Sequence, residues 1–397
     1  MKRFLLVSLA CYGMYAAARV PKTTPATPME KLISENFQFA EQQYRYLRNS
    51  APYDSMPRTY KDGRNVNSDL EWWTSGFYPG TILYIYEFSR HPELLEEAKK
   101  RLNALEVEQT NTINHDLGFK MFCSFGNAYR LTKDGKYKAV ILQSSKSLAT
   151  RYRPVISSIQ SWNKSKAFNC PVIIDNMMNL EMLEWASNNG GSKELATISV
   201  NHSNATLKNH FRDNYSSYHV LDYDLTTGKI IKKVTSQGAN DTSAWSRGQG
   251  WALYGFTMMY RFTKNKTYLS QAKGIAGFIM NHPNLPEDKI PYWDFDAPGI
   301  PDAPRDVSAA SVYASALLEL AQYCKGTERQ GYIDLAKKIL VSLSSKAYRA
   351  GLGENGGFIL KHSVGSIPHK SEIDVPLTYA DYYFMEALLR YKRWYLN

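Results

Sequence analysis

The chain has 397 residues, of which 44% are hydrophobic and 13% aromatic, and its formal net charge is +11. This length and apolar content are ample for a large buried core, and they allow either one large domain or two. The charge favours anionic partners, but no run of five Lys or Arg residues and no nucleic-acid-binding motif occurs. Nucleic acid is therefore not expected as a partner.

The first 18 residues have the pattern of a secretory signal peptide. Lys2 and Arg3 form a basic start, residues 4–10 are apolar, and residues 16–18 offer small side chains for cleavage. The apolar stretch is too short to span a bilayer. We expect an exported protein, periplasmic or outer-membrane associated in a Gram-negative bacterium, without a membrane span. Cys11 after Ser-Leu-Ala leaves a lipoprotein signal open as the alternative.

Removal of that segment would leave three cysteines, Cys123, Cys170 and Cys324. Their odd number and wide spacing predict no disulfide framework. No CxxC, HExxH or other metal-ligand spacing occurs, so neither a metal nor a cofactor is expected. For an exported basic protein, an acidic polysaccharide is the natural partner, and a solvated surface without any partner is the alternative.

After a Pro/Thr-rich leader at residues 19–28, hydrophobic periodicity predicts helix after helix, separated by Gly-containing turns. One β-hairpin is expected at 220–224 and 229–234, around a Thr227-Gly228 turn. Residues 29–397 are therefore expected to form a single all-α domain. The predicted helices span 29–49, 73–90, 92–107, 118–132, 135–152, 175–188, 191–209, 244–264, 266–281, 306–325, 328–346 and 378–394.

Every second helix is preceded or opened by a cluster of polar and aromatic residues. The six clusters lie at 72–76, 115–118, 175–176, 241–247, 305–308 and 372–374. Helix N-termini carry free N–H groups and a positive dipole end, so six of them at one mouth would favour an anionic ligand. A simpler interpretation is that these residues are N-caps, a role we assign to Asp241 and Ser308, with Asp306 as a further candidate.

Capping does not explain why Trp73, His115, Arg247 and Trp251 occur at the same helix ends. The helices that these clusters open contain many small residues, as in Ala309, Ala310 and Ala314. Small residues allow close approach of neighbouring helices, which an inner ring of helices requires. Six helical hairpins arranged as a toroid would bring the six clusters to one mouth.

Carboxylates in apolar or aromatic surroundings are the strongest chemical signal. Asp175 follows the apolar stretch 171–174, and Asp116 lies in Asn114-His115-Asp116-Leu117-Gly118-Phe119. Burial disfavours the charged form, so the pKa of such a carboxyl rises toward the range of a general acid, and a second carboxylate nearby raises it further. From spacing alone, caps or buried polar links remain the alternative for both residues.

Six motifs stand out between residue 30 and the C-terminus: Trp73-Thr74-Ser75-Gly76-Phe77, His115-Asp116-Leu117-Gly118-Phe119, Ile174-Asp175-Asn176-Met177-Met178-Asn179-Leu180, Gln237-Gly238, Ser243-Ala244-Trp245-Ser246-Arg247-Gly248-Gln249 and Tyr379-Ala380-Asp381-Tyr382-Tyr383. Together and in this order they resemble the unsaturated glucuronyl hydrolases, glycoside hydrolase family 88. The resemblance implies an (α/α)6 barrel, which agrees with the twelve helices that periodicity predicts.

The resemblance also implies a reaction unlike ordinary glycoside hydrolysis. The substrate would be an oligosaccharide whose non-reducing end is a 4,5-unsaturated uronic acid, as polysaccharide lyases leave it. Protonation at C4 and addition of water at C5 would give a hemiketal that opens and releases the neighbouring sugar. The rule that relates carboxylate separation to stereochemistry does not apply to such a hydration. Asp175 matches the general acid/base, and Asp116 matches its carboxylate partner.

For substrate binding, the resemblance implies His219, Gln237, Arg247 and Trp251. Arg247 and Trp251 are four residues apart, so on a helix they share one face. Trp73 is expected to stack on a sugar at the same mouth. For Trp251 the alternative is a core aromatic.

At two places the sequence departs from the family pattern or varies within it, and both concern residues expected near the sugar next to the unsaturated uronate. Ser236 stands where many relatives carry His before the Gln-Gly pair. The segment 363–371 corresponds to a loop in which some relatives bind sulfate, and here Lys370, with Ser366 or Ser371, is the candidate. An exposed lysine without a ligand is the alternative.

These observations predict an enzyme that removes an unsaturated uronate from lyase-generated, sulfated glycosaminoglycan oligosaccharides, without a cofactor or metal. An unsaturated rhamnogalacturonyl hydrolase acting on pectin fragments is one alternative. A non-catalytic glycan-binding protein on the same fold is another, although mere binding would not require Asp116 and Asp175 to face an anionic sugar. The oligomeric state stays open, with a monomer as the simplest expectation.

Overall fold

The computed structural model describes residues 26–396. The expected signal peptide at 1–18 and residues 19–25 of the expected leader lie outside the described residues. Thr27, at the end of that leader, caps the first helix through a capping box with Glu30. Across residues 26–396, no helix combines the length and the apolar character that crossing a bilayer demands.

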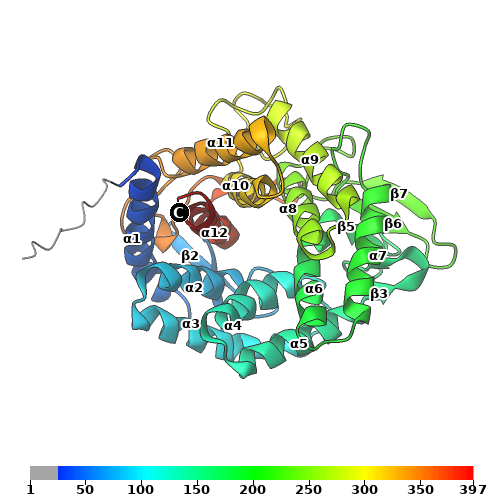
Figure 1. Ribbon diagram of the computed structural model, residues 1–397, viewed down its shortest axis with the longest axis horizontal. Coiled ribbons are helices and arrows are strands. Elements are labelled where there is room, and N and C mark those ends of the chain that lie inside the picture. Colours follow the sequence, from blue (N-terminus) through cyan, green and yellow to red (C-terminus); the bar gives the residue numbers. More distant parts are fainter. Residues whose placement is uncertain (1–25, 397) are drawn as a thin grey trace, which may run out of the picture.

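Twelve α-helices in the described chain form two rings (Figure 1). The outer ring consists of α1 (Pro28–Arg48), α3 (Pro92–Leu105), α5 (Gly135–Ala149), α7 (Glu194–Asn209), α9 (Lys266–Asn281) and α11 (Gly326–Leu343). The inner ring consists of α2 (Phe77–Ser89), α4 (Asn127–Thr132), α6 (Leu180–Asn188), α8 (Ser246–Thr263), α10 (Val307–Ala321) and α12 (Thr378–Tyr395). The fold is an (α/α)6 barrel, as the sequence predicts.

The two rings differ in how much of each helix is buried. All 15 residues of α10 are buried, whereas α3 buries only one stripe of its surface. The small residues of α10 allow it to pack between α8 and α12, as expected for an inner helix. The inner ring therefore forms the core of the barrel, and the outer ring covers it.

Two inner helices have irregular first turns. A π-helical segment, Gly118–Gly126, runs directly into α4, and a 3-10 segment, Ile174–Asn179, runs directly into α6. π-Helical segments are rare and are frequent at functional sites. Both irregular segments belong to the clusters that contain the predicted acids.

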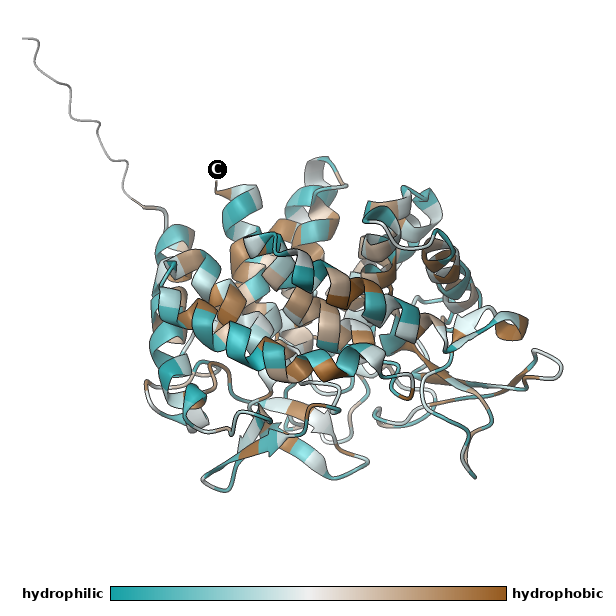
Figure 2. Ribbon diagram, turned by 90° about the horizontal axis from the view of Figure 1, so that it is seen from below, coloured by the Kyte–Doolittle hydropathy of each residue, from teal (hydrophilic) through white to brown (hydrophobic). Residues whose placement is uncertain are grey.

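Short strands and long loops gather at one end of the barrel, whereas the C-terminus lies at the other end (Figure 2). The predicted hairpin is β6 (Val220–Tyr223) and β7 (Ile230–Val234), and β5 (Pro171–Ile173) extends it into a three-stranded antiparallel sheet. Three further two-stranded pairs were not predicted, because their strands are short and lack an alternating apolar pattern. They are β1 (Met56–Lys61) with β2 (Arg64–Ser68), β3 (Tyr152–Arg153) with β4 (Ser158–Ile159), and β8 (Ser363–Ser366) with β9 (Ser371–Val375).

Two of the three capping assignments are wrong. Asp306 is the N-cap of α10 and accepts a hydrogen bond from the backbone N–H of Ser308 at 3.0 Å, so Ser308 lies inside the helix. Helix α8 begins only at Ser246, and Asp241 belongs to the preceding loop, where it accepts from the N–H of Thr235. Cys123, Cys170 and Cys324 are all free.

Candidate active site

A cavity of about 280 Å³ lies at the barrel end where the inner helices begin. Five of the eight predicted site residues line it, namely Trp73, Asp116, Asp175, Gln237 and Arg247. It shares Trp72, Trp73, His115, Asp116 and Trp162 with an adjoining groove of about 390 Å³. The two volumes together provide room for more than one sugar ring.

Strand pairing places Asp175 beside His219. Ile173 on β5 pairs with Val220 on β6, and the N–H of Ile174 donates to the carbonyl oxygen of His219 at 3.1 Å. Antiparallel pairing therefore brings the residue after Ile174 alongside His219. Nε2 of His219 lies 3.6 Å from Oδ2 of Asp175. Sequence reasoning proposed both residues for the site, and the sheet explains why they meet.

The carboxyl group of Asp175 is mostly buried, with 13% of its side chain exposed. Burial, with a smaller contribution from the charge of Asp116, raises its pKa to about 7, even though Arg247 acts in the opposite direction. Its Oδ2 atom has no hydrogen-bond partner within residues 26–396. Asp175 therefore holds a proton near neutral pH, as a general acid must.

A close backbone approach brings the segment of Asp116 to that of Asp175. A Cβ atom at Gly118 would lie 2.4 Å from Cα of Asn179, so only glycine fits at this crossing. Asn179 then bridges the two segments: its Oδ1 accepts from the N–H of Phe119, and its Nδ2 donates to Oδ1 of Asp116 at 3.4 Å. The two acids are thus fixed relative to each other by backbone packing.

His219 has a fixed tautomer. Its Nδ1 accepts hydrogen bonds from the backbone N–H groups of Ser236 and Gln237, each at 3.1 Å. Nε2 must then carry the proton of the neutral ring, and it faces Asp175. Burial lowers the pKa of His219 to about 3, so the ring stays neutral. His219 sits behind Asp175 and does not line the cavity.

Arg247 is buried and held from several sides. It forms an ion pair with Asp306 at 2.9 Å, and it donates to the carbonyl oxygens of Val364 and Gly365. Its Nη2 also donates to Oε1 of Gln237 at 3.1 Å. Arg247 therefore connects α8 with α10 and β8, and it fixes the amide of Gln237 at the cavity wall.

The remaining two predicted residues do not line the cavity, although the indole of Trp251 lies close enough to Asp175 to lower the pKa of its carboxyl group. Trp251 is fully buried and packs against Phe119 and Tyr383, with ring centroids 5.1 and 5.5 Å apart, so it supports the cavity floor without lining it. Lys370 is exposed in the turn between β8 and β9 and does not line the cavity either. The binding roles of both residues stay predictions.

Several lining residues were not singled out from the sequence. They are Arg58, Phe119, Trp162, Ile173, His369, Glu372 and Tyr379. Phe119 and Tyr379 stand within the family motifs, and Glu372 opens the last polar cluster, so these three carried a signal. Arg58 and Trp162 lie in strand or loop segments without any motif.

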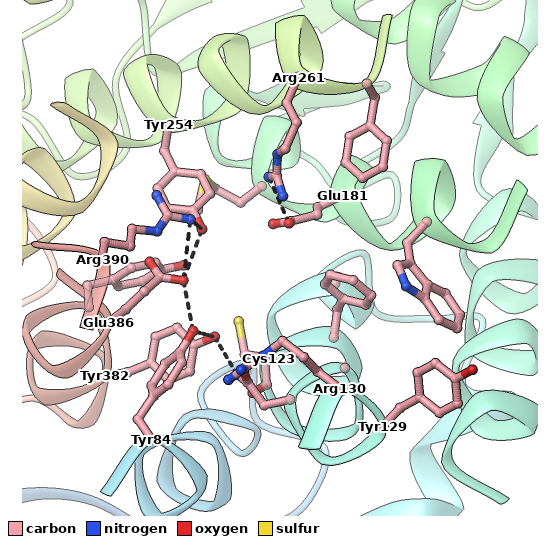
Figure 3. Close-up of a pocket in the computed structure, with 18 of the residues that line it drawn as sticks. Tyr84, Cys123, Tyr129, Arg130, Glu181, Tyr254, Arg261, Tyr382, Glu386 and Arg390 are labelled. Atoms are coloured by element: carbon pink, nitrogen blue, oxygen red, sulfur yellow. Dashed lines mark hydrogen bonds and ion pairs between the residues drawn. The ribbon is translucent and has the colours of Figure 1, made fainter. Parts of the chain in front are cut away.

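The barrel end opposite the candidate active site contains a larger cavity, of about 430 Å³ (Figure 3). Glu386 accepts hydrogen bonds from the hydroxyls of Tyr84 and Tyr254, and Arg390 pairs with Glu319. The guanidinium of Arg261 pairs with Glu181 at 2.8 Å on one side of the cavity. These charges satisfy one another, so we assign them to the stability of the inner ring. Among residues 26–396, no cluster of three or more His, Cys, Asp or Glu side chains could hold a metal ion.

Comparison with known proteins agrees with the fold and the motifs. Residues 51–394 match the family described as Glycosyl Hydrolase Family 88. An unsaturated glucuronyl hydrolase from Formosa agariphila is 47% identical over 320 residues, which cover 80% of this chain and 79% of the relative. An unsaturated chondroitin disaccharide hydrolase from Streptococcus agalactiae is 30% identical, covering 86% of each chain.

Solved structures show the same likeness. The crystal structure of an unsaturated glucuronyl hydrolase specific for heparin superposes with a TM-score of 0.89 at 45% identity, covering 92% of this chain and 98% of the other. The unsaturated glucuronyl hydrolase of Bacillus sp. GL1 superposes with a TM-score of 0.85 at 28% identity, covering 92% of this chain and 97% of the other.

Proposed function

The chain belongs to glycosyl hydrolase family 88 and is a glycosidase, and from this premise we propose that it acts as an unsaturated glucuronyl hydrolase on lyase-generated, sulfated glycosaminoglycan fragments. It would remove the 4,5-unsaturated uronate from the non-reducing end by hydrating the ring double bond. One observation carries this proposal: the carboxyl group of Asp175 has a pKa raised to about 7 and lies in a cavity lined by aromatic rings.

In this mechanism Asp175 donates its proton to C4 of the unsaturated uronate. The positive charge that develops at C5 is shared with the ring oxygen. Asp175, now a carboxylate, accepts a proton from a water molecule as the water oxygen bonds to C5, which restores the acid. The resulting hemiketal at C5 opens to a ketone, and the hemiacetal left at C1 releases the neighbouring sugar.

The surrounding residues would support this proton transfer. Asp116 raises the pKa of Asp175, so that the acid is protonated when the substrate arrives. His219 directs its Nε2–H toward Oδ2 of Asp175, which leaves Oδ1 as the oxygen that carries the transferable proton. Arg247 and Gln237 present a fixed guanidinium and amide to the bound sugar.

Two observations favour a sulfated glycosaminoglycan as the source of the substrate. The net charge of +11 suits a polyanionic partner. One structural relative is described as specific for heparin, and a variant of another was solved with dGlcA-GalNAc6S. A pectin fragment with an unsaturated uronate is the competing substrate.

The proposal is tested with a panel of lyase-made disaccharides from heparin, chondroitin and pectin. Turnover removes the double bond, so its ultraviolet absorbance should disappear with the glycosaminoglycan products. In heavy water, one deuterium should appear at C4 of the released uronate. Cleavage without this label would contradict hydration of the double bond, and turnover of the pectin product alone would contradict the glycosaminoglycan substrate.

Export is a separate proposal, based on the pattern of residues 1–18. Expression of the full chain in a Gram-negative host, followed by cell fractionation and N-terminal sequencing, would test it. A soluble periplasmic form should begin near residue 19, and a lipoprotein would instead begin at Cys11. An uncleaved cytoplasmic chain would contradict export.

A further inference from the structure

One side of the candidate active site is formed by residues that come from two distant hairpins. Arg58 on β1 and Glu372 on β9 both line the cavity that contains Asp175. Nε of Arg58 donates to Oε1 of Glu372 at 2.6 Å, and the guanidinium lies over the ring of Trp72, 4.2 Å from its centroid. The guanidinium is therefore fixed both in position and in the orientation of its plane.

This arrangement leaves one edge of the guanidinium available for a ligand. Glu372 occupies the Nε position, while Nη1 and Nη2 of Arg58 form no hydrogen bond with any residue in the range 26–396. A planar pair of N–H donors fits an oxyanion in bidentate geometry. With 22% of its side chain exposed, Arg58 lies nearer to solvent than Arg247, which is 2% exposed and whose Nη1 and Nη2 atoms both bond to protein groups.

The backbone around Glu372 is built to hold its carboxylate in this place. Glu372 has a φ of +55°, a conformation that costs a non-glycine residue on the order of 1–3 kcal/mol and that concentrates at functional sites. Its side chain lies directly over Gly365, where an added Cβ would come within 2.6 Å of Oε2 of Glu372. Gly365 in turn accepts a hydrogen bond from Arg247.

We propose that Arg58 binds a sulfate group on the sugar next to the unsaturated uronate, and that Glu372 and Trp72 are positioning residues for its guanidinium. This inference rests on the proposed function and names the residue that selects its sulfated substrates. The uronate must reach Asp175 at the buried side of the cavity, so the next sugar lies toward the rim, where Arg58 and the half-exposed Trp72 are found.

The structure distinguishes Arg58 from the other basic candidate in this region. Lys370 lies in the β8–β9 turn, but its side chain is exposed and is not part of the cavity lining. The side chains of Ser366 and His369, from the same turn, do line the cavity and bond to each other. The turn therefore contributes polar groups to this side of the site, and the cation comes from β1.

The test measures binding separately from turnover. Calorimetry on an Asp175→Asn protein would compare two unsaturated heparin disaccharides that differ only by one sulfate on the glucosamine. Addition of Arg58→Gln should weaken binding of the sulfated disaccharide about 10- to 100-fold, which is the effect expected for loss of a charge-assisted contact. The same substitution should change the affinity for the unsulfated disaccharide about 2-fold at most. Arg64→Gln, an exposed residue on β2 of the same hairpin, is the matched control and should change neither affinity.

A second variant checks the positioning role. Glu372→Gln keeps the charge of Arg58 but weakens the contact that orients it, so binding of the sulfated disaccharide should fall several-fold while thermal unfolding stays close to that of the parent. Equal losses for both disaccharides in Arg58→Gln, or a selective loss in Lys370→Gln instead, would overturn the assignment. Turnover of neither disaccharide by the unmodified enzyme would contradict the proposed function, whereas the calorimetric comparison would still decide the role of Arg58.

Discussion

Nε2 of His219 lies 3.6 Å from Oδ2 of Asp175, and the turn at Ser236 and Gln237 fixes which nitrogen of His219 carries the proton. The imidazole stays neutral, because burial lowers its pKa to about 3. It can therefore orient the acid without adding a charge that would draw the proton away from Asp175. The same strand pairing that builds the small sheet thus also determines the geometry of the acid.

The first prediction concerns the pH dependence of turnover. Asp175 must be protonated to act, and its pKa is raised to about 7, so kcat/KM should fall above about pH 7 with the slope of one proton. Initial rates on an unsaturated disaccharide between pH 5 and 9 would measure this. A rate that stays constant up to pH 9 would contradict Asp175 as the acid.

Replacement of Asp175 by Asn should abolish turnover and make the folded protein more stable at alkaline pH. The pKa of Asp175 is higher in the folded protein than in the unfolded chain, so the folded state holds this proton more tightly. Below about pH 4 the carboxyl group is protonated in both the folded and the unfolded state, so it does not change the free energy of unfolding. As the pH rises, ionisation in the unfolded state lowers that free energy, and the loss reaches its full value above about pH 7. The rise of this pKa from 3.8 to about 7 corresponds to a free-energy difference on the order of 4 kcal/mol.

Urea unfolding of both proteins at pH 4 and pH 8 would measure this difference. At pH 4 the free energies of unfolding should agree, and at pH 8 the Asn variant should be the more stable by up to that amount. An advantage of the same size at both values would show that titration of Asp175 is not the cause.

His219→Ala should lower kcat more than it raises KM. The change removes the N–H that faces Asp175 and leaves two backbone donors without an acceptor. The N–H dipole at 3.6 Å from Oδ2 favours the charged form of the carboxyl group, so its loss raises the pKa of Asp175 and should move the alkaline limb of the pH profile to higher pH. His91→Ala, at the start of α3 on the outer ring, is the control and should leave kcat and the profile unchanged.

The sequence was sufficient to predict the barrel but only part of the site. Apolar periodicity of 3.6 residues is a local property, so the inner and outer helices, and the polar clusters that open the inner ones, could be predicted without tertiary contacts. Asp175 and Asp116 were found because each stands in an apolar or aromatic stretch. Their spatial relation to each other depends on the Gly118–Asn179 crossing, which is not visible in any local pattern.

The residues at the cavity rim could not be predicted for the same reason. Arg58 and Glu372 are separated by 314 positions, and their contact exists only because the two hairpins meet at the mouth of the barrel. Lys370 was chosen because it stands in a recognisable loop, yet the turn directs it to solvent. Local sequence indicates which chemical groups are present, whereas strand pairing decides which of them face the ligand.

The cluster at the opposite end of the barrel should contribute stability and not catalysis. Arg390 is buried and bonds to Glu386 and to the hydroxyl of Tyr254 (Figure 3). It also pairs with Glu319. Arg390→Met would remove the cation that Glu319 and Glu386 share and leave buried negative charge uncompensated, which costs about 3–5 kcal/mol. Thermal and urea unfolding should show this loss, while KM at a temperature where the variant is folded should not change. A raised KM with unchanged stability would instead indicate a ligand site in this cavity.

The last prediction concerns Gly365 and Glu372, which connect Arg247 with Arg58. In Gly365→Ala the new methyl group would lie 2.6 Å from Oε2 of Glu372, so the carboxylate must move away and Arg58 loses its orientation. We expect a several-fold loss of kcat/KM on sulfated disaccharides. Gly277→Ala in α9 is the matched control, because nothing lies within 4 Å of the added methyl group. It should leave kcat/KM unchanged and raise stability by about 0.5–1 kcal/mol. Equal activity of the two alanine variants would show that the position of Glu372 over Gly365 does not matter for the substrate.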